Sequence, residues 1–397
     1  MSTGWSPLLE ERDAAAAREA VDAIAGDLMR TAPGSATLAA GDAGIALFFD
    51  YLSREQRLPV PAPHLERAIE ALRQDELDAS LYSGFLGVAW TVEHLRGQNR
   101  DLNQGVDEAL LEFLADDEFA YPFDLIAGLV GMGVYALERG ARGTRILHRT
   151  VELLGSGASR RDGRASWRAA PELLPGDQIA SGGGYYNLGI AHGTGGVLAF
   201  LSFAKRAGAE VEPLLSETAR WMDSRRDSSG SYPCLVDVTD LSGKQLRSAW
   251  CHGDPGLAAA WLAAARAQGN HGLEDEALRL ARQLAGRSPA ELGVNDAGLC
   301  HGAAGLGHLF NRLFQTTREP LFAAEARRWF RAALDLRRPG SGVGGFFAAG
   351  LGEGGRVRWE SDPGFLAGAA GVGLALLAAT GSVAPSWDRL LLVSSHG

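Results

Sequence analysis

The sequence of 397 residues is poor in cysteine and in basic residues, and each shortage excludes a class of protein. Three cysteines cannot form the disulfide framework of a small secreted protein. Lys and Arg number 38 against 48 Asp and Glu, which gives a net charge of −10 and no basic surface for nucleic acid. The N-terminal residues have neither the basic region nor the apolar stretch of a secretion signal. We therefore expect a cytoplasmic protein that does not bind nucleic acid.

A long uninterrupted apolar run is also absent. The segment from Pro363 to Trp387 carries no charged residue, but three glycines interrupt its apolar run from Phe365 to Ala379. This run is shorter than the roughly 20 residues that span a bilayer. The segment therefore predicts a buried core helix and no transmembrane segment. Because 46% of all residues are hydrophobic, the chain can bury a large core.

Glycine, in contrast, is abundant: 52 residues, about twice the usual share of roughly 7%. Many of these glycines form a recurring Gly-x-x-Gly pair that precedes a run of small or aliphatic residues. Seven copies are spaced by 43 to 66 residues, and their first glycines are Gly41, Gly84, Gly128, Gly193, Gly253, Gly302 and Gly368. The runs that follow are apolar almost all round, which predicts helices buried on every side.

Amphipathic stretches rich in Ala, Glu, Arg and Leu alternate with these runs, at 10–30, 63–75, 106–116, 144–154, 212–223, 273–286 and 320–336. Such stretches are typical of surface helices. Seven buried and seven amphipathic helices in alternation predict an all-α fold, an α/α toroid with an inner and an outer ring, built as one domain over residues 1–397. The glycine pairs would let backbones approach closely at one end of the ring.

Three longer intervals between copies contain loops rich in Gly and Ser, at 155–187, 224–246 and 338–362. The last two have the pattern of irregular hairpins. We expect some of these loops to surround the mouth of the central cavity.

Histidine and cysteine break the repeat at one position. The residue before the first glycine is small in four copies but is His192, His252 or His301 in the other three. Cys251 and Cys300 directly precede two of these histidines, whereas the third cysteine lies outside the pattern. Thiolate and imidazole are the ligands that zinc prefers, so Cys251, Cys300 and His301 form a candidate zinc site. The alternative is that both cysteines are ordinary buried thiols.

A zinc ion with two thiolates and one neutral histidine has no net charge, which suits activation of a substrate thiol. His192, in a copy without cysteine, is then a candidate acid or base, and otherwise a structural histidine. Asp124 lies among apolar residues and needs a partner, either His192 or the N-terminus of a helix. Arg247 is a candidate for stabilising a developing enolate or carboxylate, or is a solvated loop residue.

Three other polar residues carry less information. His308, on the apolar run after His301, is predicted to belong to the core. No comparable argument points to Asp254 or Asp296.

Three sequence blocks together resemble the signature of the LanC family of lanthionine synthetases: Asn187 to Gly193, Trp250 to Gly256 and Leu299 to Gly305. The resemblance extends through all seven repeats. It implies an α/α barrel with a catalytic zinc. Bacterial members of this family cyclise lantibiotic precursors by adding a cysteine thiol to dehydroalanine or dehydrobutyrine.

Carried over residue by residue, the resemblance makes Cys251, Cys300 and His301 the zinc ligands. These are the same residues that their position in the glycine repeat indicates. His192 and Asp124 match the family's proposed acid/base residue and its partner.

Arg247 matches an active-site arginine of the family. His252 falls where some bacterial cyclases have tyrosine, and it is kept here as a catalytic candidate. Some cyclases carry a small β-rich insertion early in the barrel, for which the first two intervals of 43 and 44 residues leave no room. The mode of binding a leader peptide is therefore open.

The resemblance implies a reaction in which zinc takes a substrate cysteine as thiolate and the sulfur attacks the β-carbon of a dehydro residue. His192 then handles the proton that the α-carbon receives. The expected partner is a dehydrated precursor peptide, with leader and core segments, and a dehydratase is a further candidate partner.

Three other functions compete with this one. A LanC-like zinc protein could bind or add glutathione or another thiol. A peptide-binding scaffold with structural zinc would need a fourth protein ligand, for which His252 is the obvious candidate. A glycosidase or terpene cyclase on a similar toroid is disfavoured, because no pair of carboxylates matches the Cys/His cluster.

Overall fold

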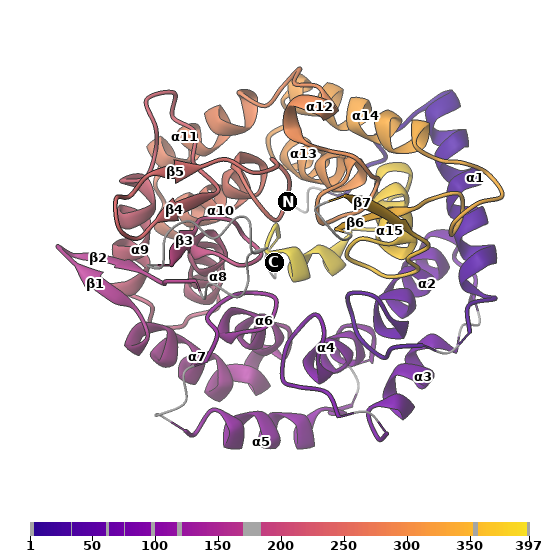
Figure 1. Cartoon of the computed structure of the whole chain (residues 1–397). Coiled ribbons are helices and arrows are strands. Elements are labelled where there is room, and N and C mark those ends of the chain that lie inside the picture. The colour runs from indigo at the N-terminus through magenta and orange to yellow at the C-terminus, as the bar shows by residue number, and fades with distance from the viewer. Residues whose placement is uncertain are drawn as a thin grey trace. The chain divides into compact units, whose positions relative to one another are not determined.

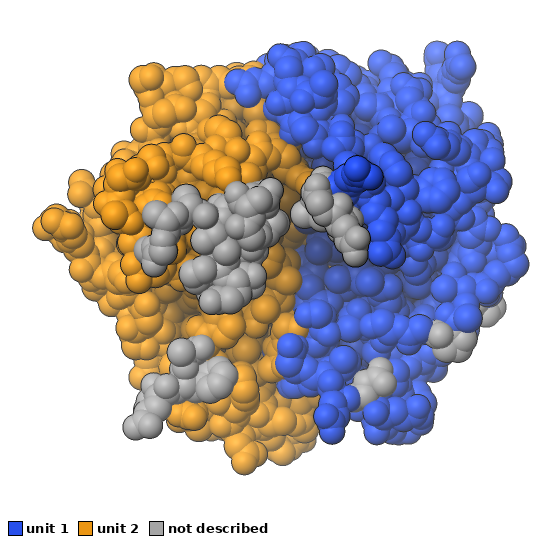
Figure 2. All heavy atoms as spheres, in the orientation of Figure 1, with its two compact units in different colours: residues 1–78, 82–100, 285–387 blue, residues 79–81, 101–284, 388–397 orange. Residues whose placement is uncertain are grey.

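The computed structural model describes residues 4–32, 34–60, 63–74, 76–96, 100–116, 121–169, 184–351 and 356–394. The chain is mostly helical (Figure 1). It divides into two compact units, of which unit 1 comprises residues 1–78, 82–100 and 285–387, and unit 2 comprises residues 79–81, 101–284 and 388–397 (Figure 2).

Unit 1 is built on four apolar helices, which pack in the order α13, α15, α2, α4. Amphipathic helices cover them: α1 packs on α15, α14 packs on α13, and α3 packs on α2 and α4. The elements of unit 1 are α1 (Glu11–Leu28), α2 (Asp42–Gln56), α3 (His64–Ala71), α4 (Phe85–Arg96), α12 (Pro289–Leu292), α13 (Ala303–Thr317), α14 (Pro320–Asp335), β6 (Ala348–Leu351), β7 (Val357–Glu360) and α15 (Ala369–Thr380).

Unit 2 repeats this arrangement. Apolar helices α6, α8 and α10 pack in that order, and the amphipathic helices α7, α9 and α11 each cover one of them. The helices of unit 2 are α5 (Gln104–Phe113), α6 (Leu129–Glu138), α7 (Thr144–Ser156), α8 (Thr194–Arg206), α9 (Leu214–Asp223), α10 (Asp254–Gln268) and α11 (His271–Arg282), with the short 3-10 turn η1 (Gly140–Gly143). A further 3-10 turn, η4, runs over Ser386–Leu391.

Every amphipathic stretch predicted from the sequence overlaps a helix, and every glycine pair is followed by one. The charge-free segment near the C-terminus forms α15, whose residues 369–379 are all buried, so its assignment to the core is confirmed. Among the described residues, no helix combines the length and the apolar character that a membrane crossing requires. The single domain predicted for residues 1–397 stays a prediction.

Short strands occupy the loops between helices. In unit 2, β1 (Ser159–Arg161) pairs with β2 (Arg164–Ser166), and β3 (Tyr185–Asn187), β4 (Leu235–Asp237) and β5 (Gly243–Lys244) form a three-stranded antiparallel sheet. In unit 1, β6 and β7 pair antiparallel, with Ala349 opposite Trp359. The two predicted hairpins, in 224–246 and 338–362, are therefore confirmed. Residues 170–183 of the loop at 155–187 lie outside the described residues, and the placement of the three loops around a cavity mouth stays a prediction.

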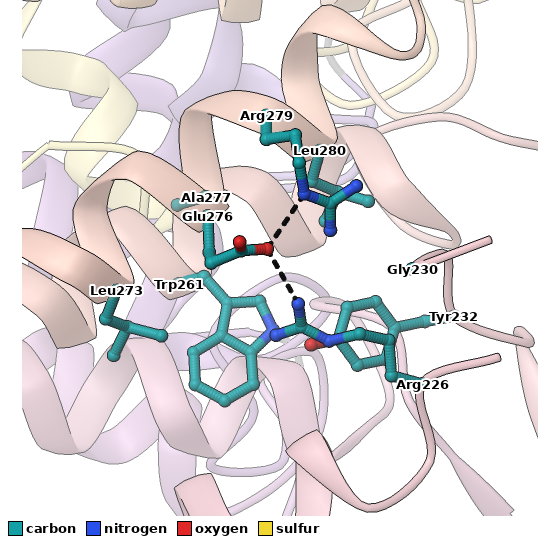
Figure 3. A pocket seen from close by; sticks show the side chains of 9 residues that line it. All are labelled: Arg226, Gly230, Tyr232, Trp261, Leu273, Glu276, Ala277, Arg279 and Leu280. Atoms are coloured by element: carbon teal, nitrogen blue, oxygen red, sulfur yellow. Dashed lines mark hydrogen bonds and ion pairs between the residues drawn. The ribbon is translucent and has the colours of Figure 1, made fainter. Parts of the chain in front are cut away.

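The outer face of unit 2 shows how a loop is fixed to an amphipathic helix (Figure 3). The Glu276 carboxylate on α11 accepts hydrogen bonds from Arg226 Nη1 at 2.9 Å and from Arg279 Nε at 2.8 Å. The Arg226 guanidinium also lies over the Tyr232 ring, 5.5 Å from its centre. The charged groups in this small pocket therefore pair with one another and hold the segment after α9 against α11.

The glycine pairs have a local physical cause. In six described copies, a Cβ atom on the second glycine would lie well inside 3.0 Å of the carbonyl oxygen six residues earlier, a distance that real Cβ atoms essentially never show. These glycines are Gly44, Gly131, Gly196, Gly256, Gly305 and Gly371. The chain before each helix folds back over its first turn, so backbone carbonyls accept hydrogen bonds from N–H groups that a helix leaves unpaired, as in Ala369 N to Asp362 O at 2.9 Å.

Neighbouring copies approach through the same glycines. A Cβ on Gly44 would lie 2.6 Å from the Cβ of Phe365, and a Cβ on Gly371 would lie 2.9 Å from Leu299 Cδ1. The predicted close approach at one end of the helices is thus confirmed within unit 1. The same glycines are also required by the tight turn of their own copy, where the carbonyl oxygen six residues earlier leaves no room for a Cβ. The sequence did not indicate this second requirement.

Replacing Gly371 by alanine is expected to destabilise the protein by about 3 kcal/mol, because the new methyl group meets the Phe365 carbonyl and Leu299 at once. Gly105 in α5 is the matched control, since nothing lies within 4 Å of a Cβ placed there. Gly105→Ala should leave stability unchanged or raise it by up to about 1 kcal/mol. Urea denaturation measures both changes, and equal midpoints for the two variants would contradict the steric account.

Candidate active site

The turns before four of the apolar helices, α2, α8, α13 and α15, share one construction. The residue six positions before the first glycine accepts, through its side chain, a hydrogen bond from the N–H two residues further on. The bond joins Ser35 to Thr37 at 3.2 Å, Asn187 to Gly189 at 2.8 Å, Asp296 to Gly298 at 3.1 Å and Asp362 to Gly364 at 2.7 Å. Such turns are typical of Asp, Asn and Ser. They give the residues between turn and helix the same backbone position in these four copies.

Backbone hydrogen bonds then link the turns of neighbouring copies. In unit 1, Cys300 N donates to Leu366 O at 2.8 Å, Leu366 N donates to Ala39 O at 3.0 Å, and Ala39 N donates to Tyr82 O at 2.9 Å. All four residues lie two positions before a first glycine. Equivalent positions therefore lie side by side in successive copies.

Unit 2 has the corresponding link. Ala191 N donates to Cys251 O at 3.4 Å, and both residues again lie two positions before a first glycine. A Cβ on Gly189 would collide with the same Cys251 carbonyl. The backbone around Cys251 is thus fixed by the adjacent turn.

The candidate ligand atoms of Cys251, Cys300 and His301 all lie within 4.8 Å of one another. Tetrahedral zinc with bonds of about 2.3 Å to sulfur and about 2.0–2.1 Å to nitrogen separates its ligand atoms by roughly 3.6–3.8 Å. The observed group needs only a contraction of about 1 Å to reach that geometry. Cys251 is buried and the other two residues are half-buried, so the group is consistent with a zinc site at the positions that the sequence predicted. That these residues bind the metal stays a prediction.

Asp296 contacts the candidate histidine ligand. Its Oδ2 atom lies 3.3 Å from His301 Nε2 and also accepts a hydrogen bond from Ala349 N, in β6, at 2.9 Å. Burial disfavours ionisation of Asp296, but the facing His301 imidazole and the N–H groups of Ala349 and Gly298 outweigh it, so the pKa of Asp296 is lowered. The carboxylate is thus ionised and oriented toward the imidazole. A carboxylate behind a ligating histidine is a common support of metal sites.

The sequence reasoning missed Asp296. The signal that could have found it is its alignment with Asn187 and Asp362 at the turn position, combined with a histidine five residues later in its own copy.

Asp124 performs both roles that the sequence left open. Its Oδ1 accepts a hydrogen bond from Ala127 N at 2.8 Å, ahead of α6, and its Oδ2 lies 3.2 Å from His192 Nδ1. Asp124 is buried, whereas 36% of the His192 side chain is exposed. An Nδ1 proton on His192 therefore points at a fixed carboxylate, which leaves Nε2 as the nitrogen available to a ligand.

Two copies depart from this turn chemistry: one has Pro122 at the turn position, and the other has Arg247. Arg247 occupies the position that Ser35, Asn187, Asp296 and Asp362 hold in other copies, and its side chain cannot accept the hydrogen bond that forms their turn. Arg247 is half-buried, and within the described residues its guanidinium has no ion pair. The charge is therefore available to a ligand, although no described contact joins the guanidinium to His192, Cys251 or Cys300.

His252 lies between Cys251 and the first glycine of its copy. Its carbonyl accepts a hydrogen bond from Ala249 N at 2.8 Å, and its Nδ1 would be 3.0 Å from a Cβ on Gly189. These contacts fix the backbone of the turn but assign no chemical role, so catalysis by His252 stays a prediction.

Cys234 and His308 are structural. Burial raises the pKa of the Cys234 thiol to about 11, and the sulfur lies 3.7 Å from the Arg247 carbonyl, so Cys234 is a neutral thiol. His308 is buried in unit 1, with its ring 4.6 Å from that of Trp387. The prediction that His308 belongs to the core is confirmed.

Two of the relatives found by sequence comparison are informative here. The chain is 25% identical over 320 residues to the nisin biosynthesis protein NisC of Lactococcus lactis subsp. lactis, a match that covers 71% of this chain and 75% of that protein. It is 29% identical over 136 residues to glutathione S-transferase LANCL1 of Danio rerio, which covers 34% of this chain and 32% of that protein.

Among solved structures, nisin cyclase matches with a TM-score of 0.73 and 21% sequence identity, covering 95% of this chain and 97% of the other. This likeness shows the fold, and the α/α toroid predicted from the glycine pairs is confirmed. At the level of sequence, residues 32–392 match the lanthionine synthetase C-like proteins, and the chain belongs to this family.

Proposed function

We propose that this chain is a zinc-dependent lanthipeptide cyclase, which adds cysteine thiols of a peptide to dehydroalanine or dehydrobutyrine and so forms lanthionine or methyllanthionine rings. The observation that carries the proposal is that the candidate ligand atoms of Cys251, Cys300 and His301, from two copies of the repeat, lie within 4.8 Å of one another in a chain of this family.

Cys251, Cys300 and His301 would hold the metal, with His301 binding through Nδ1 because Nε2 faces Asp296. When bound, zinc lowers the pKa of a coordinated substrate thiol and presents it as a thiolate. Among the described residues the group offers three ligands, which would leave room for a substrate thiol and favours a catalytic over a structural site.

His192 would handle the proton. Addition forms one bond between sulfur and the β-carbon, and the former double-bond electrons become an enolate at the α-carbon and carbonyl. Protonation of the α-carbon completes the reaction, so the thiol proton is the only atom displaced and no oxidant or reductant takes part. Asp124 holds His192 Nδ1, and we assign Nε2 as the atom that delivers the proton.

Arg247 would stabilise the negative charge of the enolate, since its guanidinium has no ion pair with any described residue and can face an anion. His252 would complete the catalytic set. The partner would be a dehydrated precursor peptide of leader and core, accompanied by a dehydratase, and the cytoplasmic location expected from the composition agrees with such a partner.

Addition of glutathione is the second candidate function, and the similarity to the LANCL1 glutathione S-transferase favours it. The two functions are separated by incubating the zinc-loaded protein with a dehydrated peptide that contains one cysteine, with and without glutathione. A cyclase removes the peptide's free thiol without a change in mass, whereas glutathione addition raises the peptide's mass and leaves its cysteine open to alkylation.

Cys300→Ala is expected to lose most of the roughly one zinc per chain that the wild type carries, together with cyclisation. Cys234→Ala is the matched control, because Cys234 is a buried neutral thiol outside the cluster. It should keep both zinc and activity. Metal analysis and alkylation of the peptide thiol measure the two effects. Zinc retained by the Cys300 variant would refute the ligand assignment.

Asp124→Asn is expected to lower kcat about a hundredfold with little change in KM, because the amide cannot hold His192 in the tautomer that a carboxylate selects. The asparagine oxygen still accepts from Ala127 N, so the turn before α6 is kept. A kcat within twofold of the wild type would show that Asp124 acts on the fold alone.

Asp296→Asn is expected to weaken zinc binding by about 10- to 100-fold, as loss of a supporting carboxylate does at other zinc sites. Asp362→Asn is the matched control: it changes the same turn position in a copy without a histidine, so zinc affinity should stay at the wild-type value. Competition with a chromophoric chelator gives both affinities. Equal losses in the two variants would mean that the turn, and not the contact with His301, supports the metal.

A further inference from the structure

A cavity of about 150 Å³ lies in unit 1 beside Asp296. Its walls come from the turn around Asp296, from the residues that follow α14, from the segment before β6 and from β7. The residues that matter here are Asp296, Leu336, Arg338, Phe346, Phe347 and Trp359.

Four of these six side chains are large and apolar, and two are exposed. The exposed fraction is 53% for Trp359 and 41% for Leu336, whereas Phe346 is buried. Exposed apolar residues that line a concavity mark a binding site more often than isolated ones do. Arg338 is exposed and supplies one positive charge among these residues.

Asp296 joins this cavity to the candidate metal centre. It lines the cavity, and its Oδ2 atom contacts both His301 Nε2 at 3.3 Å and the backbone of β6. The Asp296 carboxylate therefore contacts the candidate ligand His301 and also forms part of the cavity wall. Because a peptide residue spans only about 3.3–3.6 Å, a residue near the substrate cysteine in sequence is the one we expect to approach this cavity.

The size of the cavity limits its occupant. An engineered apolar cavity of about 150 Å³ binds one benzene molecule. A space of this size accepts the phenyl ring of phenylalanine or a leucine side chain, and it excludes a folded segment.

We infer that this cavity is a subsite for one bulky apolar side chain of the peptide substrate, close in sequence to the cysteine whose thiol is activated. The inference rests on the proposed function and narrows its substrate class. Glutathione has no bulky apolar side chain, so the subsite favours a peptide over that thiol.

The test is equilibrium binding to the zinc-loaded protein by calorimetry. Two peptides of equal length are compared, both with alanine in place of the dehydro residue so that neither cyclises. One has Phe and the other Ser next to the cysteine. The wild type should bind the Phe peptide about tenfold more tightly, as an apolar pocket does for a side chain that fills it.

Trp359→Ala and Leu336→Ala should each reduce the ratio of the two dissociation constants toward one. Both side chains are substantially exposed, so neither variant should impair folding. Val357→Ala is the matched control: Val357 is 48% exposed on the same strand as Trp359 and is not among the residues lining the cavity, so the tenfold ratio should persist.

Equal binding of both peptides by the wild type, no binding of either, or a ratio that survives both pocket substitutions would overturn the subsite. The proposed function is judged separately, by cyclisation of the matching peptides that contain dehydroalanine. Cyclisation at equal rates would leave the enzyme assignment intact while removing the subsite. Tight, selective binding of the Phe peptide without cyclisation would remove the enzyme assignment and leave the binding of the apolar side chain in the cavity intact.

Discussion

The contact that the rest of the structure depends on is the close approach of a glycine to the carbonyl oxygen six residues earlier. It folds each turn back over the first turn of the following helix and pairs N–H groups that a helix start leaves exposed. Because this turn recurs before the apolar helices, residues at equal distance from the glycine take equal positions. Backbone bonds such as Cys300 N to Leu366 O then set those positions next to one another.

The chemistry resides in substitutions at three of these positions. The position that makes the turn holds Ser, Asn or Asp in four copies, but Arg247 in the copy that also carries Cys251. The two positions before the glycine hold cysteine and histidine where other copies have small or apolar residues. Asp296 contributes to both the fold and the site. Its Oδ1 accepts the turn hydrogen bond from Gly298 N, and its Oδ2 faces His301. A repeated scaffold of this kind can gain a site by changing single residues while its backbone hydrogen bonds stay in place.

Much of the fold was predictable because it follows from periodic patterns: glycine spacing located the apolar helices, and Ala/Glu/Arg/Leu stretches located the amphipathic ones. The Cys251, Cys300 and His301 cluster was predictable for the same reason, since equal register implies proximity. The turn position of Asp296 was open to prediction from its alignment with Asn187 and Asp362, but its contact with His301 was not, because that contact depends on which carboxylate oxygen the turn uses. Nor did the sequence show that Asp124 divides its two oxygens between Ala127 and His192. The cavity beneath Trp359 likewise needed the packing of three separate segments, which no local pattern records.

The central claim is that two thiolates and one imidazole, from two copies of the repeat, surround a single zinc ion. X-ray absorption at the zinc edge of the purified wild-type protein tests it most directly. The account predicts two sulfur neighbours at about 2.3 Å and two nitrogen or oxygen neighbours at about 2.0–2.1 Å, the latter being the imidazole and an exchangeable ligand. A shell of nitrogen and oxygen alone would contradict it, as would a protein that binds no zinc.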